Sequence, residues 1–144
     1  MFRGVDEHTI DEKGRLSLPA KHREQLGETV IVWRALDGQL NVYPVKVWEE
    51  VAETAEQLNQ LQKSVRRAMR ILYTITECDI DRQGRILIPP SFRAYAGLNT
   101  NVVIVGVRDH LEIWSQERFE QEWTELATDG SDIMEPLAGS GLRM

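Results

Sequence analysis

The sequence predicts an α+β protein, mainly β, built from two tandem pseudo-symmetric halves that share one core. The prediction rests on an internal repeat. The stretch from Asp11 to Arg23 and the stretch from Asp81 to Arg93, seventy positions apart, share an aspartate, a glycine, an arginine, two aliphatic residues, a proline and a final arginine in the same order. Two copies are too few for a solenoid, which needs about three or more, so a pseudo-two-fold pair is expected.

Length and composition limit the class of protein. The 144 residues are 42% hydrophobic and 28% charged, which is typical of one soluble globular domain. No stretch approaches the roughly 20 apolar residues that span a bilayer, so no membrane association is expected. The N-terminal residues lack the apolar run of a signal peptide, which predicts a cytoplasmic protein. Cys78 is the only cysteine and excludes an internal disulfide.

Each half is expected to begin with a strand, a tight turn and a second strand, over residues 7–18 and their counterparts. Asp11 and Asp81 open the turn, because an aspartate side chain accepts hydrogen bonds from backbone amides just ahead of it. Gly14 and Gly84 close the turn and tolerate positive φ, which is typical of a type I turn followed by a bulge. After the turn, aliphatic residues alternate with polar ones, so Arg15 is expected on the outward face.

The remainder of each half repeats the same order of elements. A proline and a glycine bracket a helix of about two turns, over residues 19–27 and 89–97. Two further strands follow, at residues 30–33 and 40–43 and at residues 102–105 and 111–114. Each half is therefore a ββαββ unit. Because so few elements cannot cover their own sheet, two units are expected to share one core.

Helices are expected to flank both units. Apolar residues recur at helical spacing over 45–61, over 65–72 and over 119–126. From about Thr128 the period is lost, which predicts a loose tail. The expected organisation is a first repeat with its amphipathic helix (1–62), a connecting basic helix with the second repeat and a closing helix (63–127), and a flexible tail (128–144).

Charge is divided along the chain. The net charge of −6 and the pI of about 5.1 argue against nucleic-acid binding, since contacts to phosphate supply most non-specific affinity. However, residues 63–93 hold seven basic and three acidic residues, a balance of +4, whereas residues 108–135 hold two basic and nine acidic ones, a balance of −7. Such asymmetry favours one basic face.

The Asp11/Arg15 and Asp81/Arg85 pairs are the main candidate functional residues. One interpretation is structural: an aspartate that caps its turn and a solvated arginine at the strand edge. A turn needs the aspartate and the glycine, however, and does not need the arginine. The planar arginine fork grips phosphate or reads guanine O6 and N7, and a two-stranded ribbon fits the major groove. Two such turns would form paired prongs.

Other chemistry finds little support in the residues. His8, His22 and His110 are too scattered for metal ligands, and Ser17 lacks the glycine frame of a nucleophile elbow. No glycine-rich phosphate loop is present. The sequence therefore predicts no cofactor, no metal and no enzymatic activity. A cluster of arginines at 66, 67 and 70 is interpreted as a solvated helix face or an interface rather than a DNA contact.

The repeated Asp-x-x-Gly-Arg motif, followed by Leu or Ile, a second aliphatic residue and proline, resembles that of the MraZ family of bacterial regulators over residues 1–127. Each half is similar to the AbrB-type DNA-binding unit, in which two hairpins interleave into a small barrel of the double-psi or swapped-hairpin kind. The resemblance implies a cytoplasmic, nucleoid-associated repressor that forms ring-shaped homo-oligomers. It also implies binding to short repeated G-containing promoter boxes in double-stranded DNA, upstream of the division and cell wall gene cluster, with the protein's own promoter among the targets.

The resemblance also implies roles for residues. The motif residues are Asp11, Gly14, Arg15, Asp81, Gly84 and Arg85, with the two arginines as the DNA-facing members. Further DNA contacts are expected from Arg3, Lys13, Lys21, Arg23, Arg82 and Arg93. The alternative is a protein-interaction module of AbrB-like fold, whose basic prongs meet an acidic partner and which binds DNA weakly and without sequence preference.

Overall fold

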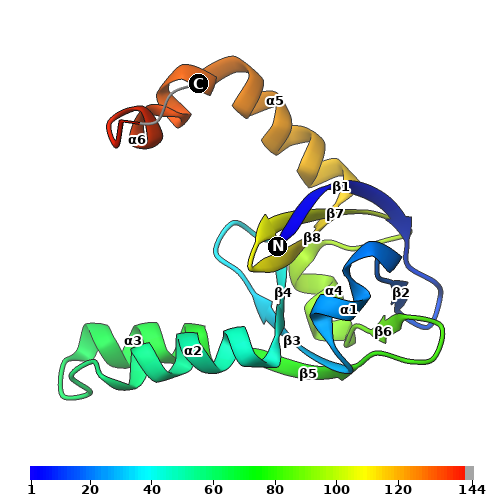
Figure 1. Cartoon of the computed structure of the whole chain (residues 1–144), viewed down its shortest axis with the longest axis horizontal. Coiled ribbons are helices and arrows are strands. Elements are labelled where there is room, and N and C mark those ends of the chain that lie inside the picture. Colours follow the sequence, from blue (N-terminus) through cyan, green and yellow to red (C-terminus); the bar gives the residue numbers. More distant parts are fainter. Residues whose placement is uncertain (142–144) are drawn as a thin grey trace.

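The computed structural model describes residues 1–141 and shows a mixed α+β protein rich in strands (Figure 1), which confirms the predicted class. The strands are β1 (Phe2–Thr9), β2 (Arg15–Ser17), β3 (Thr29–Arg34), β4 (Leu40–Pro44), β5 (Ile75–Asp79), β6 (Arg85–Leu87), β7 (Asn101–Arg108) and β8 (His110–Ser115). The helices are the 3-10 helix η1 (Ala20–His22), α1 (Arg23–Leu26), α2 (Val45–Glu56), α3 (Lys63–Leu72), α4 (Pro90–Ala96), α5 (Gln116–Ile133) and α6 (Glu135–Ala138). Each half thus has the expected ββαββ order.

Six strands form one open antiparallel sheet in the order β1-β7-β8-β4-β3-β5, and β2 pairs with β6 as a separate two-stranded ribbon. The two halves exchange their first strands. β1 of the first half pairs with β7 of the second, and β5 of the second half pairs with β3 of the first. The β4–β8 and β2–β6 pairs also join the halves. Neither half therefore completes its sheet without the other, while the AbrB-like barrel remains a prediction from the resemblance.

One buried cluster joins residues of both halves beneath the ribbon and the sheet. Leu16 and Leu18 from the first half and Ile86 and Ile88 from the second are all fully buried. Burial of such a side chain stabilises a fold by about 1.5–3 kcal/mol. These residues alternate with the outward residues of β2 and β6, so burying the aliphatic side chains fixes which side chains the ribbon presents to solvent.

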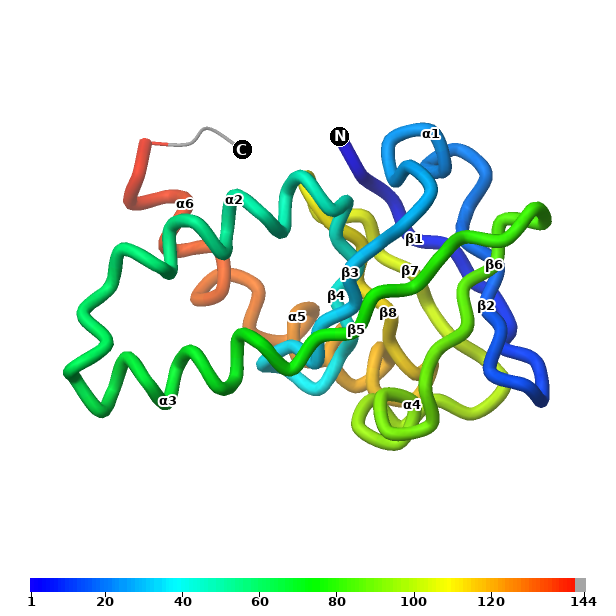
Figure 2. The backbone as a smooth tube through the Cα atoms, turned by 90° about the horizontal axis from the view of Figure 1, so that it is seen from below, coloured from blue at the N-terminus to red at the C-terminus, as the bar shows by residue number. Residues whose placement is uncertain are grey.

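Two helical extensions leave the sheet. α2 and α3 form a hairpin that projects on the side of the molecule away from the β2–β6 ribbon, as both views show (Figures 1 and 2). Trp48 of α2 is buried and contacts Tyr43 and Tyr73. Leu58 and Leu61, expected on the apolar face of a helix over 45–61, lie beyond the end of α2 and are exposed.

The C-terminal segment differs from the expected loose tail. α5 runs on past Thr128 to Ile133, with one non-helical residue at Asp129, and α6 follows to Ala138. Part of the expected tail, residues 142–144, lies outside the described residues. Among residues 1–141, no helix combines the length and the apolar character needed to cross a membrane.

Candidate nucleic-acid interface

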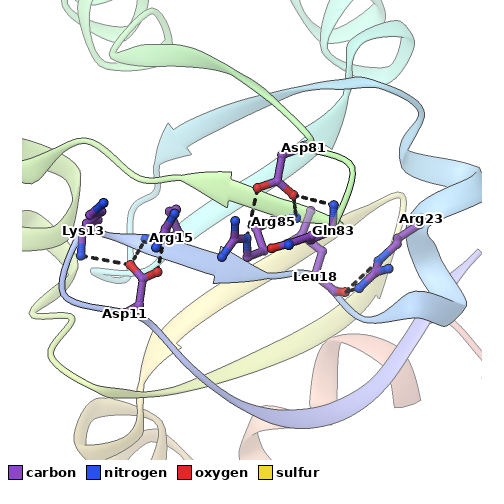
Figure 3. A network of polar contacts seen from close by, with 8 residues as sticks. All are labelled: Asp11, Lys13, Arg15, Leu18, Arg23, Asp81, Gln83 and Arg85. Atoms are coloured by element: carbon purple, nitrogen blue, oxygen red, sulfur yellow. Dashed lines mark hydrogen bonds and ion pairs between the residues drawn. The ribbon is translucent and has the colours of Figure 1, made fainter.

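The first turn is organised by one carboxylate. Asp11 Oδ1 accepts hydrogen bonds from the backbone amides of Lys13 and Arg15, both at 2.9 Å. Its other oxygen, Oδ2, accepts a hydrogen bond from Arg15 Nε at 2.6 Å. Gly14 has a φ of +86°, so the last turn position needs the conformational freedom of glycine. The predicted turn chemistry is confirmed, and the same aspartate also holds the arginine (Figure 3).

The second turn has the same geometry. Asp81 Oδ1 accepts from the amides of Gln83 and Arg85 at 2.9 Å, and Asp81 Oδ2 accepts from Arg85 Nε at 3.0 Å. Gly84 has a φ of +77°. The repeat in the sequence is therefore also a repeat of the hydrogen bonds, down to which atom of the carboxylate each donor reaches.

These bonds set the charge state of the turns. The backbone amide of Arg15 is the strongest influence that holds the pKa of Asp11 below its ordinary value, and the Arg15 side chain lowers that pKa further. The amide and side chain of Arg85 lower the pKa of Asp81 in the same way. Both carboxylates are thus ionised at neutral pH, and each guanidinium stays paired through Nε. The Nη1 and Nη2 edges of both guanidinium groups have no hydrogen-bond partner among residues 1–141.

The outward face of the ribbon brings both arginines together. In the β2–β6 register, Arg15 lies opposite Leu87 and Ser17 lies opposite Arg85. The two arginines are therefore diagonal neighbours on one face, while Leu16 and Ile86 point into the core. Figure 3 shows the two arginine side chains between the two turns. Because the strands are antiparallel, the turns lie at opposite ends of the ribbon.

The other predicted contact residues fall into three groups. Lys13 and Arg82 are exposed on the turns themselves, beside the ribbon. Arg3 and Lys21 lie elsewhere: Arg3 is near the start of β1, and Lys21 is paired with Asp6 of the same strand at 2.9 Å. The structure therefore does not bring this second group onto the ribbon.

Arg23 and Arg93 form the third group, and both side chains are half-buried. Arg23 Nε and Nη2 donate to the carbonyl oxygen of Leu18 at 3.2 and 3.1 Å, and Arg93 Nε donates to that of Ile88 at 3.0 Å. The resemblance implies DNA contacts for both residues, and no motif in the sequence indicates that their partners are backbone carbonyls.

Two further residues of the ribbon's outward face are not among the predicted contact residues. Ser17 and Leu87 share the outward face with the arginines, and 58% of Leu87 is exposed. Leu87 is thus an apolar residue at one end of an otherwise polar outward face. The signal was present in the sequence, because the alternation that places Arg15 outward also places Ser17 and Leu87 there.

Comparison with known proteins places the chain among bacterial regulators. The family described as "MraZ protein, putative antitoxin-like" matches twice, over residues 1–71 and 71–135. The two matches agree with the internal repeat.

Individual relatives match over nearly their whole length. A protein of Moorella thermoacetica named "Transcriptional regulator MraZ" is 43% identical over 139 residues, which cover 96% of this chain and 94% of that protein. Proteins of the same name from Limosilactobacillus reuteri and Herpetosiphon aurantiacus are 46% and 37% identical, over 95% and 99% of this chain and 97% and 100% of theirs.

Proposed function

The chain belongs to the MraZ family, whose members are regulators of transcription and not enzymes, and we propose from this that it regulates transcription by binding specific DNA sequences through the β2–β6 ribbon. The observation that carries the proposal is a pair of arginines on one outward face, each held by an aspartate through its Nε. Two identical cationic groups, held by ionised carboxylates at the centre of a narrow ribbon, are suited to reading bases.

The geometry of each arginine supports recognition of guanine. The aspartate accepts the Nε–H, which restrains the plane of the guanidinium and leaves Nη1 and Nη2 without a hydrogen-bond partner among residues 1–141. A bidentate contact to guanine O6 and N7 needs two donors in one plane, and such a contact discriminates against a wrong base by about 1–3 kcal/mol. A two-stranded ribbon fits the major groove, which is about 12 Å wide. Lys13 and Arg82, at the ends of the ribbon, would meet phosphates.

The proposed targets are the short repeated G-containing boxes of the promoter upstream of the division and cell wall genes, including the protein's own promoter. Occupation of a promoter by the protein would exclude the transcription machinery, which makes repression the expected outcome. The proposal places the protein in the cytoplasm, associated with the nucleoid. No step requires a cofactor.

Self-association into a ring is part of the proposal, because repeated boxes favour a repeated reader. The helical extensions offer complementary surfaces. α3 exposes Arg67 and Arg70, whereas α5 exposes acidic residues that include Glu120 and Glu125. Contact between α3 of one copy and α5 of the next is a heterologous interface, which closes into a ring when the rotation allows. Binding of a second box then becomes effectively intramolecular.

The test is a binding measurement with the upstream duplex of the gene and a scrambled duplex, by fluorescence anisotropy over a salt series. The wild type is expected to prefer the upstream duplex and to lose affinity steeply with salt, by about 0.9 in the log–log slope per phosphate contact. The double variant Arg15→Ala/Arg85→Ala should lose the preference. Equal, feeble binding of the wild type to both duplexes would instead favour the protein-interaction module, which binds DNA weakly and without sequence preference.

A further inference from the structure

Arg23 and Arg93 occupy equivalent positions in the two halves, and each lies against the turn of the other half. A Cβ atom added to Gly14 would stand 2.8 Å from Arg93 Cζ and Nε, and one added to Gly84 would stand closer still to Arg23. The guanidinium of each arginine therefore packs directly on the glycine of the opposite turn. Both glycines are buried, although they belong to turns whose other residues are exposed.

Backbone hydrogen bonds cross between the halves at the same places. The amide of Leu18 donates to the carbonyl oxygen of Gly84 at 2.9 Å, and the carbonyl oxygen of Leu18 accepts from Arg23. Leu18 thus binds the second turn with its amide and the arginine that covers this turn with its carbonyl. Figure 3 shows Arg23 and Leu18 next to the second turn.

The equivalent bonds in the other direction follow the same pattern. The amide of Ile88 donates to the carbonyl oxygen of Gly14 at 2.9 Å, and its own carbonyl oxygen accepts from Arg93 Nε. In each set, the arginine contacts both the aliphatic residue of its own half and the turn glycine of the other half, and the aliphatic residue also binds that glycine. Each set therefore joins the two halves. The turn that holds Arg15 is therefore fixed by the second half, and the turn that holds Arg85 by the first.

We propose that Arg23 and Arg93 are positioning residues, each of which fixes the turn that presents the other half's reading arginine. Arg93 acts on Arg15 and Arg23 acts on Arg85. The inference rests on the proposed function, and it replaces the direct DNA contact that the sequence predicted for these two arginines. A cation whose Nε is bound to a carbonyl and whose plane covers a glycine is engaged in the fold before any DNA arrives.

Two variants of Arg93 separate the roles, because one keeps the charge and the other keeps the planar donor. The Nε2 of a glutamine at this position would stand where Arg93 Nε stands, so Arg93→Gln retains the bond to the Ile88 carbonyl without the charge. Arg93→Lys retains the charge without the plane. A positioning role predicts that the glutamine variant keeps selective binding to the upstream duplex. The lysine variant should lose about tenfold in affinity, because it lacks the planar Nε donor to the Ile88 carbonyl. A phosphate contact predicts the reverse order.

The salt dependence gives a second readout that loss of folding does not imitate. If Arg93 contacted phosphate, Arg93→Gln would lower the slope of log affinity against log salt by about 0.9. The positioning role leaves this slope unchanged. Thermal unfolding of both variants checks that each is folded at the temperature of the binding assay.

Amide chemical shifts of the full-length protein without DNA test the crossing directly. Arg93→Lys is expected to shift the amide resonances of Gly14 and Arg15 and to leave those of Gly84 and Arg85 in place, while Arg23→Lys should give the opposite pattern. Shifts confined to each arginine's own half, or a lysine variant that binds better than the glutamine variant, would overturn the proposal. This readout is independent of DNA. Unselective wild-type binding would therefore defeat the proposed function, while the amide shifts would still show whether each arginine fixes the turn of the other half.

Discussion

At the scale of single residues, one aspartate in each half serves the fold and the candidate site with different oxygens. Oδ1 of Asp11 and of Asp81 closes the turn by accepting two backbone amides, and Oδ2 holds the arginine. An asparagine would satisfy the turn through its own Oδ1, but its NH2 group would face the donor of the arginine. The need for a second acceptor explains why the repeat keeps a carboxylate at both positions.

Acid should weaken the fold through these two carboxylates. Their pKa values are lowered in the folded state, so the stability they contribute is present above the ordinary aspartate pKa of about 3.9 and is lost as pH falls through the lower folded-state values. We expect the unfolding free energy of Asp11→Asn/Asp81→Asn to fall less between pH 5 and pH 3, endpoints set roughly around that pKa, than that of the wild type. Urea unfolding at both pH values measures this. Parallel losses in the two proteins would show that other groups control the acid sensitivity.

Gly84→Ala should destabilise the protein for two separable reasons. A φ of +77° costs an L residue about 1–2 kcal/mol, and the new methyl group displaces Arg23 from the turn. In an Arg23→Ala background only the first cost remains, so the glycine substitution should be less costly there. A double-mutant cycle by denaturant unfolding measures the difference. An equal loss of unfolding free energy in both backgrounds would mean that Arg23 moves away from the new methyl group without cost.

The residue types of the site were predictable from sequence, but their partners were not. The repeat identified Asp11, Arg15 and their counterparts, because duplication of a turn does not require duplication of an arginine. Arg23 and Arg93 are different. Both are cations near a basic motif, and nothing in their spacing indicates that a backbone carbonyl and a distant glycine occupy them in the fold.

At the scale of elements, local chemistry predicts the order of strands and helices well and their lengths less well. Pro19 and Gly27, like Pro89 and Gly97, bracket short helical segments as expected. β1 is longer than predicted, because its outer residues pair with β7 and carry no apolar alternation of their own. α5 continues through Asp129 and Gly130, where the loss of period and the glycine predicted an end.

The short helical segment of the first half contains a polar defect that the repeat reveals. His22 is buried, with an Nε2 atom that has no hydrogen-bond partner among the described residues, and its counterpart in the second half is Phe92. His22 contacts the ring of Phe2 edge-on, with the ring centroids 5.2 Å apart, a contact that a phenylalanine could also make. The second half thus shows the apolar form of the same position.

His22→Phe should therefore stabilise the protein, by about 1–3 kcal/mol at pH 7, because an unpaired buried polar group is removed. Burial, and next the charge of Lys21, lower the pKa of His22, so the wild type loses stability as pH falls from about 6.5 toward the folded-state value. The variant should lack this part of the pH dependence. Thermal melts between pH 5 and pH 7.5, roughly either side of the ordinary histidine pKa, test both points. A variant less stable than the wild type at pH 7 would indicate that a solvent molecule or a backbone group satisfies the ring.

At the scale of the whole molecule, the sequence predicts that two halves share a core but not which strands pair. The repeat is symmetric, so β1 could pair equally with β3 of its own half or with β7 of the other. The structure has the exchanged pairing, in which β1 and β5 form the edges of the sheet. Cross-pairing also explains why the ribbon has one strand from each half, and hence why Arg15 and Arg85 share a single face.

The basic and acidic segments of the chain lie in different parts of the structure. The basic α3 lies in the helical hairpin, away from the ribbon, and the acidic α5 leaves the sheet separately (Figure 1). The overall acidity therefore need not oppose DNA at the ribbon, because much of it is carried by α5. Arg66 is partly committed to the hairpin, where Nη1 donates to the carbonyl oxygens of Gln60 and Leu61. Arg67 and Arg70 make no side-chain bonds among residues 1–141 and are the residues that an acidic surface would meet.

Reversal of the charges of Arg67 and Arg70 should dissociate the homo-oligomer without altering the β2–β6 ribbon. Arg67→Glu/Arg70→Glu is expected to reduce the mass of the assembly in light scattering, because α3 then repels α5 of the neighbouring copy. Binding to a duplex with several boxes should weaken by a factor of about 100 or more, which is the usual range of avidity, while binding to a single box stays the same. Adding Glu120→Lys/Glu125→Lys to the same chain reverses both surfaces and should restore the assembly. An assembly unchanged by the first pair of substitutions, or not restored by the second, would place the subunit contact on other surfaces.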